Sequence, residues 1–358
     1  TWRYDNKWFS QELELGARFH NDLIKRDHTE KGYWMRNATL VYNQLGKDTI
    51  LQNDVSTFAW AFHALDRIQL GEQWFVNPGV RLELIDWHYR DTTDTTQPVD
   101  QSDFYAVVIP GIGVVFQPLS WLNLVGGIHR GFSPAAPGPD KNVDYESSIN
   151  YEAGVRLAYA LSRLEVIGFL NDYSNLTAIC SLNRGCSEEQ VDQQTNAGRV
   201  HVYGVETSVE QKVNLPLHLV GLGRLAYTLT LSEFQEAFES SDPLLGDVNV
   251  GDALPYVPVH QGTLILGVQH KMFDVSVSTA YVGEMRDVAG QGDIPDPERI
   301  ADYIAVDFAG SVQVSKTDQL YVHIDNVLNN EYMVSRRPYG ARPGMPFQFM
   351  VGYKGTFQ

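Results

Sequence analysis

The chain has 358 residues, of which 43% are hydrophobic and 20% are charged, and its 44 acidic against 27 basic residues give a formal net charge of −17. This acidic excess argues against a nucleic-acid partner, because phosphate backbones are bound by basic surfaces. A transmembrane helix is not expected either: the longest apolar run, residues 105–116, is broken by Pro110 and two glycines and is shorter than the roughly 18 apolar residues that a helix needs to cross a bilayer.

Apolar and polar residues alternate over most of the chain, which is the period of a β-strand with one apolar and one polar face. Gly, Pro, Asp and Asn residues interrupt this alternation and divide it into segments. The segments predict about fourteen strands, the first over residues 9–19, and no helix. One group of connections is short and lies near residues 70–72, 117–120, 161–163, 214–216, 271–272 and 315–318. The other group is long and polar and lies near residues 27–53, 91–103, 133–148, 177–196, 235–257, 288–302 and 328–345.

Short turns alternating with long loops are typical of an outer-membrane β-barrel, with short periplasmic turns and long extracellular loops. In the strand around residues 150–159, Glu152 and Arg156 fall on the polar face, while Tyr151 and Tyr159 bracket the apolar face as interfacial aromatics would. The strands of a large soluble β-sandwich or of a β-propeller would also show this alternation of apolar and polar residues. No repeat of about 40 residues with a fixed motif is present, which disfavours the propeller.

The two cysteines of the chain, Cys180 and Cys186, lie close together in the polar run CSLNRGC. Such a pair in a cysteine-poor chain predicts a small disulfide loop and an oxidising compartment. Two free thiols are the alternative.

The end of the chain carries the most specific pattern. Residues 326–332 read NVLNNEY, residues 342–346 read RPGMP, and the closing strand places Phe347, Phe349, Val351, Tyr353 and Phe357 on one face. This arrangement resembles the C-terminal signature of TonB-dependent outer-membrane transporters. It departs from that family in having Phe347 where Arg is usual after the second proline, and Gln358 after the final aromatic.

Further stretches resemble the same family in the family's order. They are PGVRLE at residues 78–83, GFSPA at 131–135 followed by YEAGVR at 151–156, NAG at 196–198 with YGVE at 203–206, and PVH at 258–260. Within the family, the loop layout looks most like that of the ferric-dicitrate and related siderophore transporters.

The resemblance implies an all-β transmembrane antiparallel barrel in the bacterial outer membrane, in which residues 1–358 supply about fourteen strands of a 22-stranded family barrel. The plug domain and the segment that contacts TonB have no counterpart in this sequence. The implied function is reception and transport of a ferric siderophore or ferric citrate-type chelate, driven through TonB, with no resident cofactor and no metal site. A self-contained passive channel, porin-like in its action, is the alternative.

An anionic chelate requires hydrogen-bond donors at the rim of the lumen, and Arg forks supply them best. The candidate ligand-binding residues are Arg90, Arg130, Asn175, Arg336, Arg337 and Arg342. For each arginine taken singly the preferred alternative is a structural one: the resemblance implies that Arg342 shapes the loop, and the other arginines face solvent. Asn175 is included because the resemblance places a polar, ligand-touching side chain there. Trp87 and Tyr89 fit either a membrane-interface girdle or ligand stacking, and the girdle is the preferred interpretation.

Catalytic chemistry is not expected. The histidines are scattered, and neither an HExxH motif nor a close His/Cys cluster occurs. No catalytic or metal-ligating residue is therefore assigned, and the protein is predicted not to be an enzyme.

Overall fold

The structure is a computed structural model of residues 1–358. It describes all of them except residues 44, 45, 47, 136, 139–143, 180–193, 197, 241, 243, 337–339, 357 and 358, and it describes only the backbone of residues 178, 179 and 194–196. Cys180, Cys186 and Arg337 therefore lie outside the described residues.

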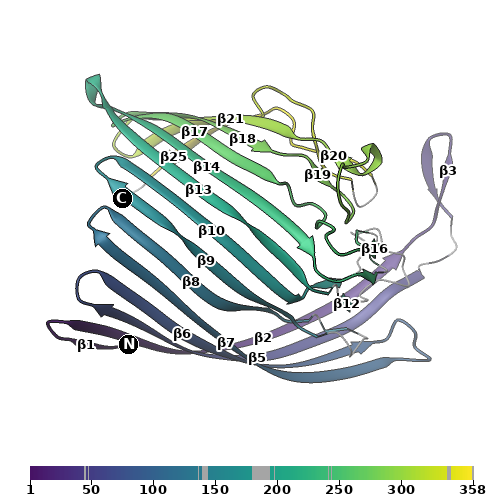
Figure 1. Ribbon diagram of the computed structural model, residues 1–358. Coiled ribbons are helices and arrows are strands. Elements are labelled where there is room, and N and C mark those ends of the chain that lie inside the picture. Colours follow the sequence, from purple (N-terminus) through teal and green to yellow (C-terminus); the bar gives the residue numbers. More distant parts are fainter. Residues whose placement is uncertain are drawn as a thin grey trace.

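Fifteen strands form one antiparallel sheet in which each main strand pairs with the next one along the chain (Figure 1). They are β1 (Trp2–Asp5), β2 (Phe9–Glu30), β5 (Asp48–Leu70), β6 (Trp74–Asp91), β7 (Val99–Leu119), β8 (Leu122–Ser133), β9 (Glu146–Tyr159), β10 (Ser162–Asn175), β13 (Val200–Leu215), β14 (Leu219–Phe234), β17 (His260–His270), β18 (Phe273–Val282), β21 (Tyr303–Gln313), β22 (Asp318–Asp325) and β25 (Gln348–Gly355). The sheet curves like part of a barrel wall, and β1 and β25 are its edge strands. The expected fold class and strand number are confirmed, with β1 as the additional short strand.

Short two-stranded ribbons extend the loops at one end of the wall. They are β3 (Tyr33–Arg36) with β4 (Thr39–Tyr42), β11 (Thr177–Ile179) with β12 (Gln194–Asn196), β15 (Phe238–Glu239) with β16 (Asp247–Val248), β19 (Met285–Arg286) with β20 (Arg299–Ile300), and β23 (Met333–Ser335) with β24 (Arg342–Pro343). The helical elements of the described residues are two 3-10 turns, η3 (Pro216–His218) and η4 (Asp296–Glu298). Among the described residues, no helix has the length and apolar character needed to cross a membrane.

The strand registers separate an apolar face from a polar face. In β5, Phe58, Trp60 and Phe62 point to one side with 42–48% of each side chain exposed, while His63 falls on the other side and lies across the ladder from Arg81. As predicted, Glu152 and Arg156 lie on the polar face of β9, and Tyr151 and Tyr159 lie on the apolar face. The apolar face is the one that a barrel turns to lipid, and the polar face lines the lumen.

The buried core lies at the long-loop end rather than inside the wall. Val200 and Phe234 are fully buried and pack with Leu245 and Val248 of the β14–β17 loop. This loop therefore folds as a packed unit over the ends of β13 and β14.

Two strand pairs extend further than the sequence indicated. The β2–β5 ladder continues to Glu30↔Asp48, and the β6–β7 ladder continues to Asp91↔Val99, through stretches that the sequence assigned to loops. Strands that project above a bilayer have water on both faces, so their sequence no longer alternates between apolar and polar.

Candidate functional site

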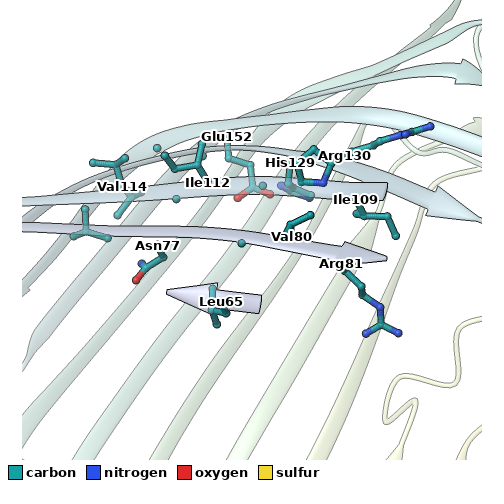
Figure 2. A pocket seen from close by; sticks show the side chains of 18 of the residues that line it. Leu65, Asn77, Val80, Arg81, Ile109, Ile112, Val114, His129, Arg130 and Glu152 are labelled. Carbon is teal, nitrogen blue, oxygen red and sulfur yellow. The ribbon is translucent and has the colours of Figure 1, made fainter. Parts of the chain in front are cut away.

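A hollow of about 540 Å³ lies over β5 to β9 and is lined mainly by lumen-facing residues (Figure 2). Its polar lining includes His63, Asn77, Arg81, His129 and Glu152. His129 and Glu152 are diagonal neighbours on β8 and β9, since Gly127 lies opposite Glu152 in the ladder. A volume of this size is in the range of small-molecule sites.

Glycines make the wall thin at this hollow. Gly113 lies opposite Gly127, and both belong to the lining. A Cβ added to Gly113 would meet no atom within 4 Å, and one added to Gly127 would come no closer than 3.5 Å to its neighbours. Because strand glycines often mark places where a ligand or another backbone approaches closely, the hollow has the character of a docking surface.

Several lumen-facing charges near the hollow are held in ion pairs. Arg81 contacts Glu83 at 2.5 Å, His63 contacts Glu14 at 3.4 Å, and Arg156 contacts Glu165. Arg67 joins two carboxylates, at 3.3 Å from Glu12 and 3.1 Å from Glu14. This part of the inner wall is thus lined by charges of both signs, rather than by a single-sign field that would select anions or cations.

A second group of polar side chains gathers at the long-loop end of β8, β9 and β10, around Tyr145. Arg130 donates from Nε to Ser147 Oγ at 3.2 Å and from one terminal nitrogen to the Tyr145 hydroxyl at 3.3 Å. Asn175 Nδ2 donates to the carbonyl oxygens of Asp144 at 3.1 Å and Tyr145 at 3.4 Å. The structure therefore brings together two of the predicted residues, Arg130 and Asn175, on one segment.

Arg130 also occupies a break in the sheet. The β7–β8 ladder ends at Gly111↔His129, next to Pro110, which has no N–H to donate. Beyond this point the second terminal nitrogen of Arg130 donates to the Val108 carbonyl at 3.0 Å, so the guanidinium replaces the missing ladder bond. Aromatic rings close the same gap, with Phe132 5.2 Å from Tyr145 and 6.3 Å from Tyr105 between ring centroids.

The electrostatics of this segment disfavour additional negative charge. Burial raises the pKa of the Glu146 carboxyl above its usual value, although a backbone hydrogen bond and a side-chain hydrogen bond from Thr177 oppose the rise. An anionic ligand here would rely on Arg130, whose described donors already have partners.

The other predicted residues lie apart from this group. Arg90 is exposed on β6, on the face opposite Trp87 and Tyr89, with Asp54 and Asp100 across the two ladders. Arg336 donates to the carbonyl oxygens of Arg299 at 2.9 Å and Asp296 at 3.2 Å, which ties the β22–β25 loop to the β18–β21 loop. Arg342 is exposed on β24 of that same loop.

The preferred interpretation of Trp87 and Tyr89 as girdle residues is wrong. Both share the face of Arg81 and Glu83 and are buried, with 6% and 1% exposed, against Val55, Val99 and Tyr105. Alternation alone did not identify this face, because charged residues occupy odd positions (Arg81 and Glu83) as well as even positions (Asp86 and Arg90) of the strand. His63, Asn77, Arg81 and His129 were not among the predicted ligand-binding residues, although their strand positions place them on the lumen side.

The described residues contain no group of three or more His, Cys, Asp or Glu side chains arranged to hold a metal ion. The predicted disulfide between Cys180 and Cys186 falls outside the described residues and stays a prediction.

Comparison with known proteins agrees with the β-sheet architecture described above. The family model described as "TonB dependent receptor-like, beta-barrel" matches residues 1–327. No curated protein sequence matches the chain.

Among solved structures, the chain is similar to the ferric-catecholate import receptor Fiu of E. coli K12 in its closed form, with TM-score 0.71 and 17% identity over 99% of this chain and 53% of that one. It is also similar to the siderophore receptor PiuA of Acinetobacter baumannii (TM-score 0.77, 14% identity, 99% and 54%) and to the ferric citrate transporter FecA (TM-score 0.72, 17% identity, 98% and 52%). The chain thus spans about half the length of these proteins, and at such low identity the likeness establishes the fold.

Proposed function

Because the chain belongs to the TonB-dependent receptor β-barrel family, we propose that it forms part of the wall of an energy-coupled receptor that carries ferric siderophores or ferric citrate-type chelates across the bacterial outer membrane. The observation that carries this proposal is the family match over residues 1–327, together with the single antiparallel sheet that has one apolar and one polar face. The named ligands of Fiu, PiuA and FecA supply the substrate class.

The glycine-lined hollow supports a role for the lumen wall in holding another part of the protein. We propose that a plug domain docks on this wall and that TonB acts on the plug rather than on the described strands. The paired charges suit such a contact, because a polypeptide offers groups of both signs together with backbone donors and acceptors.

The ferric chelate is cargo in this proposal, with no resident cofactor, metal ligand or catalytic residue. Arg130 and Asn175 would act at one place on the rim, and Arg336, Arg337 and Arg342 would act at another through the β22–β25 loop. Arg90 is exposed on the outward side of β6 and would meet the ligand only at the outermost rim. The passive-channel alternative has no observation of its own in its favour.

Ligand binding by the full-length protein in detergent tests the proposal. We expect saturable quenching of tryptophan fluorescence by ferric citrate or a ferric catecholate, and none by the iron-free chelators. Uptake in cells should disappear when TonB is deleted. A steady conductance in planar bilayers without saturable binding would instead establish the passive channel.

Arg→Gln substitutions then distinguish candidate residues that contact the chelate from those that stabilise the fold. Substitution of a residue that contacts the chelate should weaken chelate binding without lowering the unfolding temperature of the protein. Arg130→Gln should lower the unfolding temperature in addition, because it also removes the bond to the Val108 carbonyl. Asp247→Asn, at an exposed position on β16, is the matched control for a loop substitution that touches neither group.

A further inference from the structure

An apolar groove of about 550 Å³ is cut into the lipid-facing wall across β13, β14, β17 and β18. Its lining includes Val213, Leu215, Gly221, Gly223, Leu266 and Val275. In the ladders Gly221 lies between Val213 and Val268, and Gly223 lies between Gln211 and Leu266. The floor of the groove is therefore two consecutive outward positions of β14 that carry no side chain.

Contacts within the protein do not require glycine at these two positions. A Cβ on Gly221 would lie 3.4 Å from Leu215 Cδ1, and one on Gly223 would lie 3.8 Å from Leu266 Cδ2, which are ordinary van der Waals distances. Neither residue has a positive φ. By contrast, a Cβ on Gly204 would overlap the Leu229 carbonyl oxygen. Glycine inside a strand lowers stability, so the space left open at Gly221 and Gly223 is room for something outside the chain.

The groove lies at the short-turn end of the wall, where a lipid headgroup would sit. Leu215 is the last residue of β13, and Gly221 is the third residue of β14. The turn between β17 and β18 carries the exposed Lys271, three residues after the groove-lining Val268. Three residues of extended chain span at most about 10 Å, so the backbone of Lys271 lies within about that distance of Val268 at the end of the groove.

We propose that this groove binds one acyl chain of a phospholipid from the leaflet at the short-turn end, with the lipid phosphate held near Lys271. An apolar occupant is required because the exposed surface of the lining is mostly apolar, with Gln211 as a polar lining residue, and a phosphate complements the cationic side chain of Lys271. The site differs from ordinary lipid contact in that two adjacent outward positions without side chains leave room for an acyl chain between the flanking side chains. The proposal depends on the barrel architecture alone and not on which ligand is transported.

Native mass spectrometry of the full-length protein tests the proposal, with 1-palmitoyl-2-oleoyl-phosphatidylglycerol and an uncharged diacylglycerol as probes. We expect one phosphatidylglycerol per protein to survive delipidation. Gly221→Leu fills the groove and should weaken this retention about tenfold, the effect of leaving roughly two methylene groups unburied. Gly221→Ala should give an intermediate loss, and it keeps the test valid if the larger variant fails to fold.

Leu225→Phe is the matched control, because Leu225 lies on the same face of β14 but outside the groove. It should retain the lipid like the unmodified protein. Lys271→Gln should weaken retention of phosphatidylglycerol and leave retention of diacylglycerol unchanged. Equal retention by Gly221→Leu and Leu225→Phe, the absence of a retained lipid, or a dimer of the protein in place of the lipid adduct would each overturn the proposal.

Discussion

Asn326, the first residue of the C-terminal signature, makes several hydrogen bonds just after the end of β22. Its side chain is 1% exposed and donates to the carbonyl oxygens of Asn330 and Met345, both at 2.9 Å, while it accepts from the Asn330 N–H at 3.0 Å. Its φ of 47° lies in the left-handed region, which Asn tolerates better than most residues. Asn326 therefore joins the turn after β22 to the start of the last strand.

We expect Asn326→Ala to destabilise the protein by about 2–4 kcal/mol, because it leaves buried backbone groups without partners and places Ala at a positive φ. Thermal unfolding in detergent measures the loss. Glu331→Ala, an exposed neighbour in the same loop, should change the unfolding temperature little. Equal effects of the two substitutions would show that the hydrogen bonds of Asn326 do not hold the loop.

Asp172 and Arg199 form a two-pronged ion pair above the apolar band of the wall. Arg199 donates from Nε to Oδ1 at 3.0 Å and from a terminal nitrogen to Oδ2 at 2.8 Å, and His201 lies 3.3 Å from the same carboxylate. Hydrogen bonding to Arg199 lowers the pKa of Asp172 below its usual value. The carboxylate form is therefore the one that the folded protein stabilises.

A depressed carboxyl pKa contributes stability above the unfolded value, about 4, and that stability is lost as the pH falls through the folded value. Asp172→Asn should thus lower stability at pH 7 by less than about 1 kcal/mol, since both partners are partly exposed. The difference between the variant and the unmodified protein should shrink below about pH 4. Unfolding temperatures at pH 7 and pH 3 test this, and a difference that grows on acidification would contradict it.

At the scale of elements, the hairpin β3–β4 stands apart from the wall (Figure 1). It exposes large apolar side chains on both of its faces, namely Tyr33, Trp34, Met35, Leu40, Val41 and Tyr42. Its two-residue turn places Asn37 at φ 48° and Ala38 at φ 59°. Such a turn favours Asn followed by Gly, because alanine in the left-handed region is strained.

We expect Ala38→Gly to stabilise this hairpin by about 0.5–1 kcal/mol by removing that strain. Amide hydrogen exchange of residues 33–42 should slow accordingly. Asn37→Gly is the matched control and should have a smaller effect, because Asn already adopts this conformation readily. Faster exchange in Ala38→Gly would mean that the turn has another conformation in solution.

Gly344, the glycine of the RPGMP motif, also acts at this scale. A Cβ on Gly344 would overlap the ring of Tyr332, which stacks on Tyr303 at 4.2 Å between centroids. Packing therefore explains why the motif combines a Tyr with a later Gly. The backbone that leads to the final strand passes over the ring of Tyr332, where a side chain would not fit.

At the scale of the whole molecule, alternation predicted the sheet, its two faces and the sorting of short and long connections. It placed Glu152 and Arg156 on the lumen side because neighbouring positions of β9 are unambiguously apolar. It failed where both faces meet water or protein, as at Trp87, Tyr89 and the upper ladder of β2 and β5. The hollow was not predictable, because it depends on Gly113 and Gly127 meeting across two strands, and one sequence gives no register between strands.

The edges of the sheet lead to the last prediction. β25 pairs with β22 on one side, and β1 pairs with β2 at the other edge of the sheet. Each unpaired backbone group in hydrocarbon costs several kcal/mol, so a wall of this kind persists in a bilayer only if both edges are paired. We therefore expect the amides of Phe349, Val351 and Tyr353 to be as protected from exchange as those of β22 when the full-length protein is in its native membrane.

Hydrogen exchange with mass spectrometry tests this on native outer-membrane vesicles. Residues 1–358 prepared alone in detergent are the comparison, in which β25 remains an edge strand and those of its amides that point away from β22 should exchange much faster. Protection that is equally low in both preparations would mean that β25 is an edge strand in the membrane too, and that the described wall is closed by something other than strand pairing. Protection confined to the native membrane would identify β25 as the place where the wall continues, because only a neighbouring strand can satisfy a full row of backbone groups within lipid.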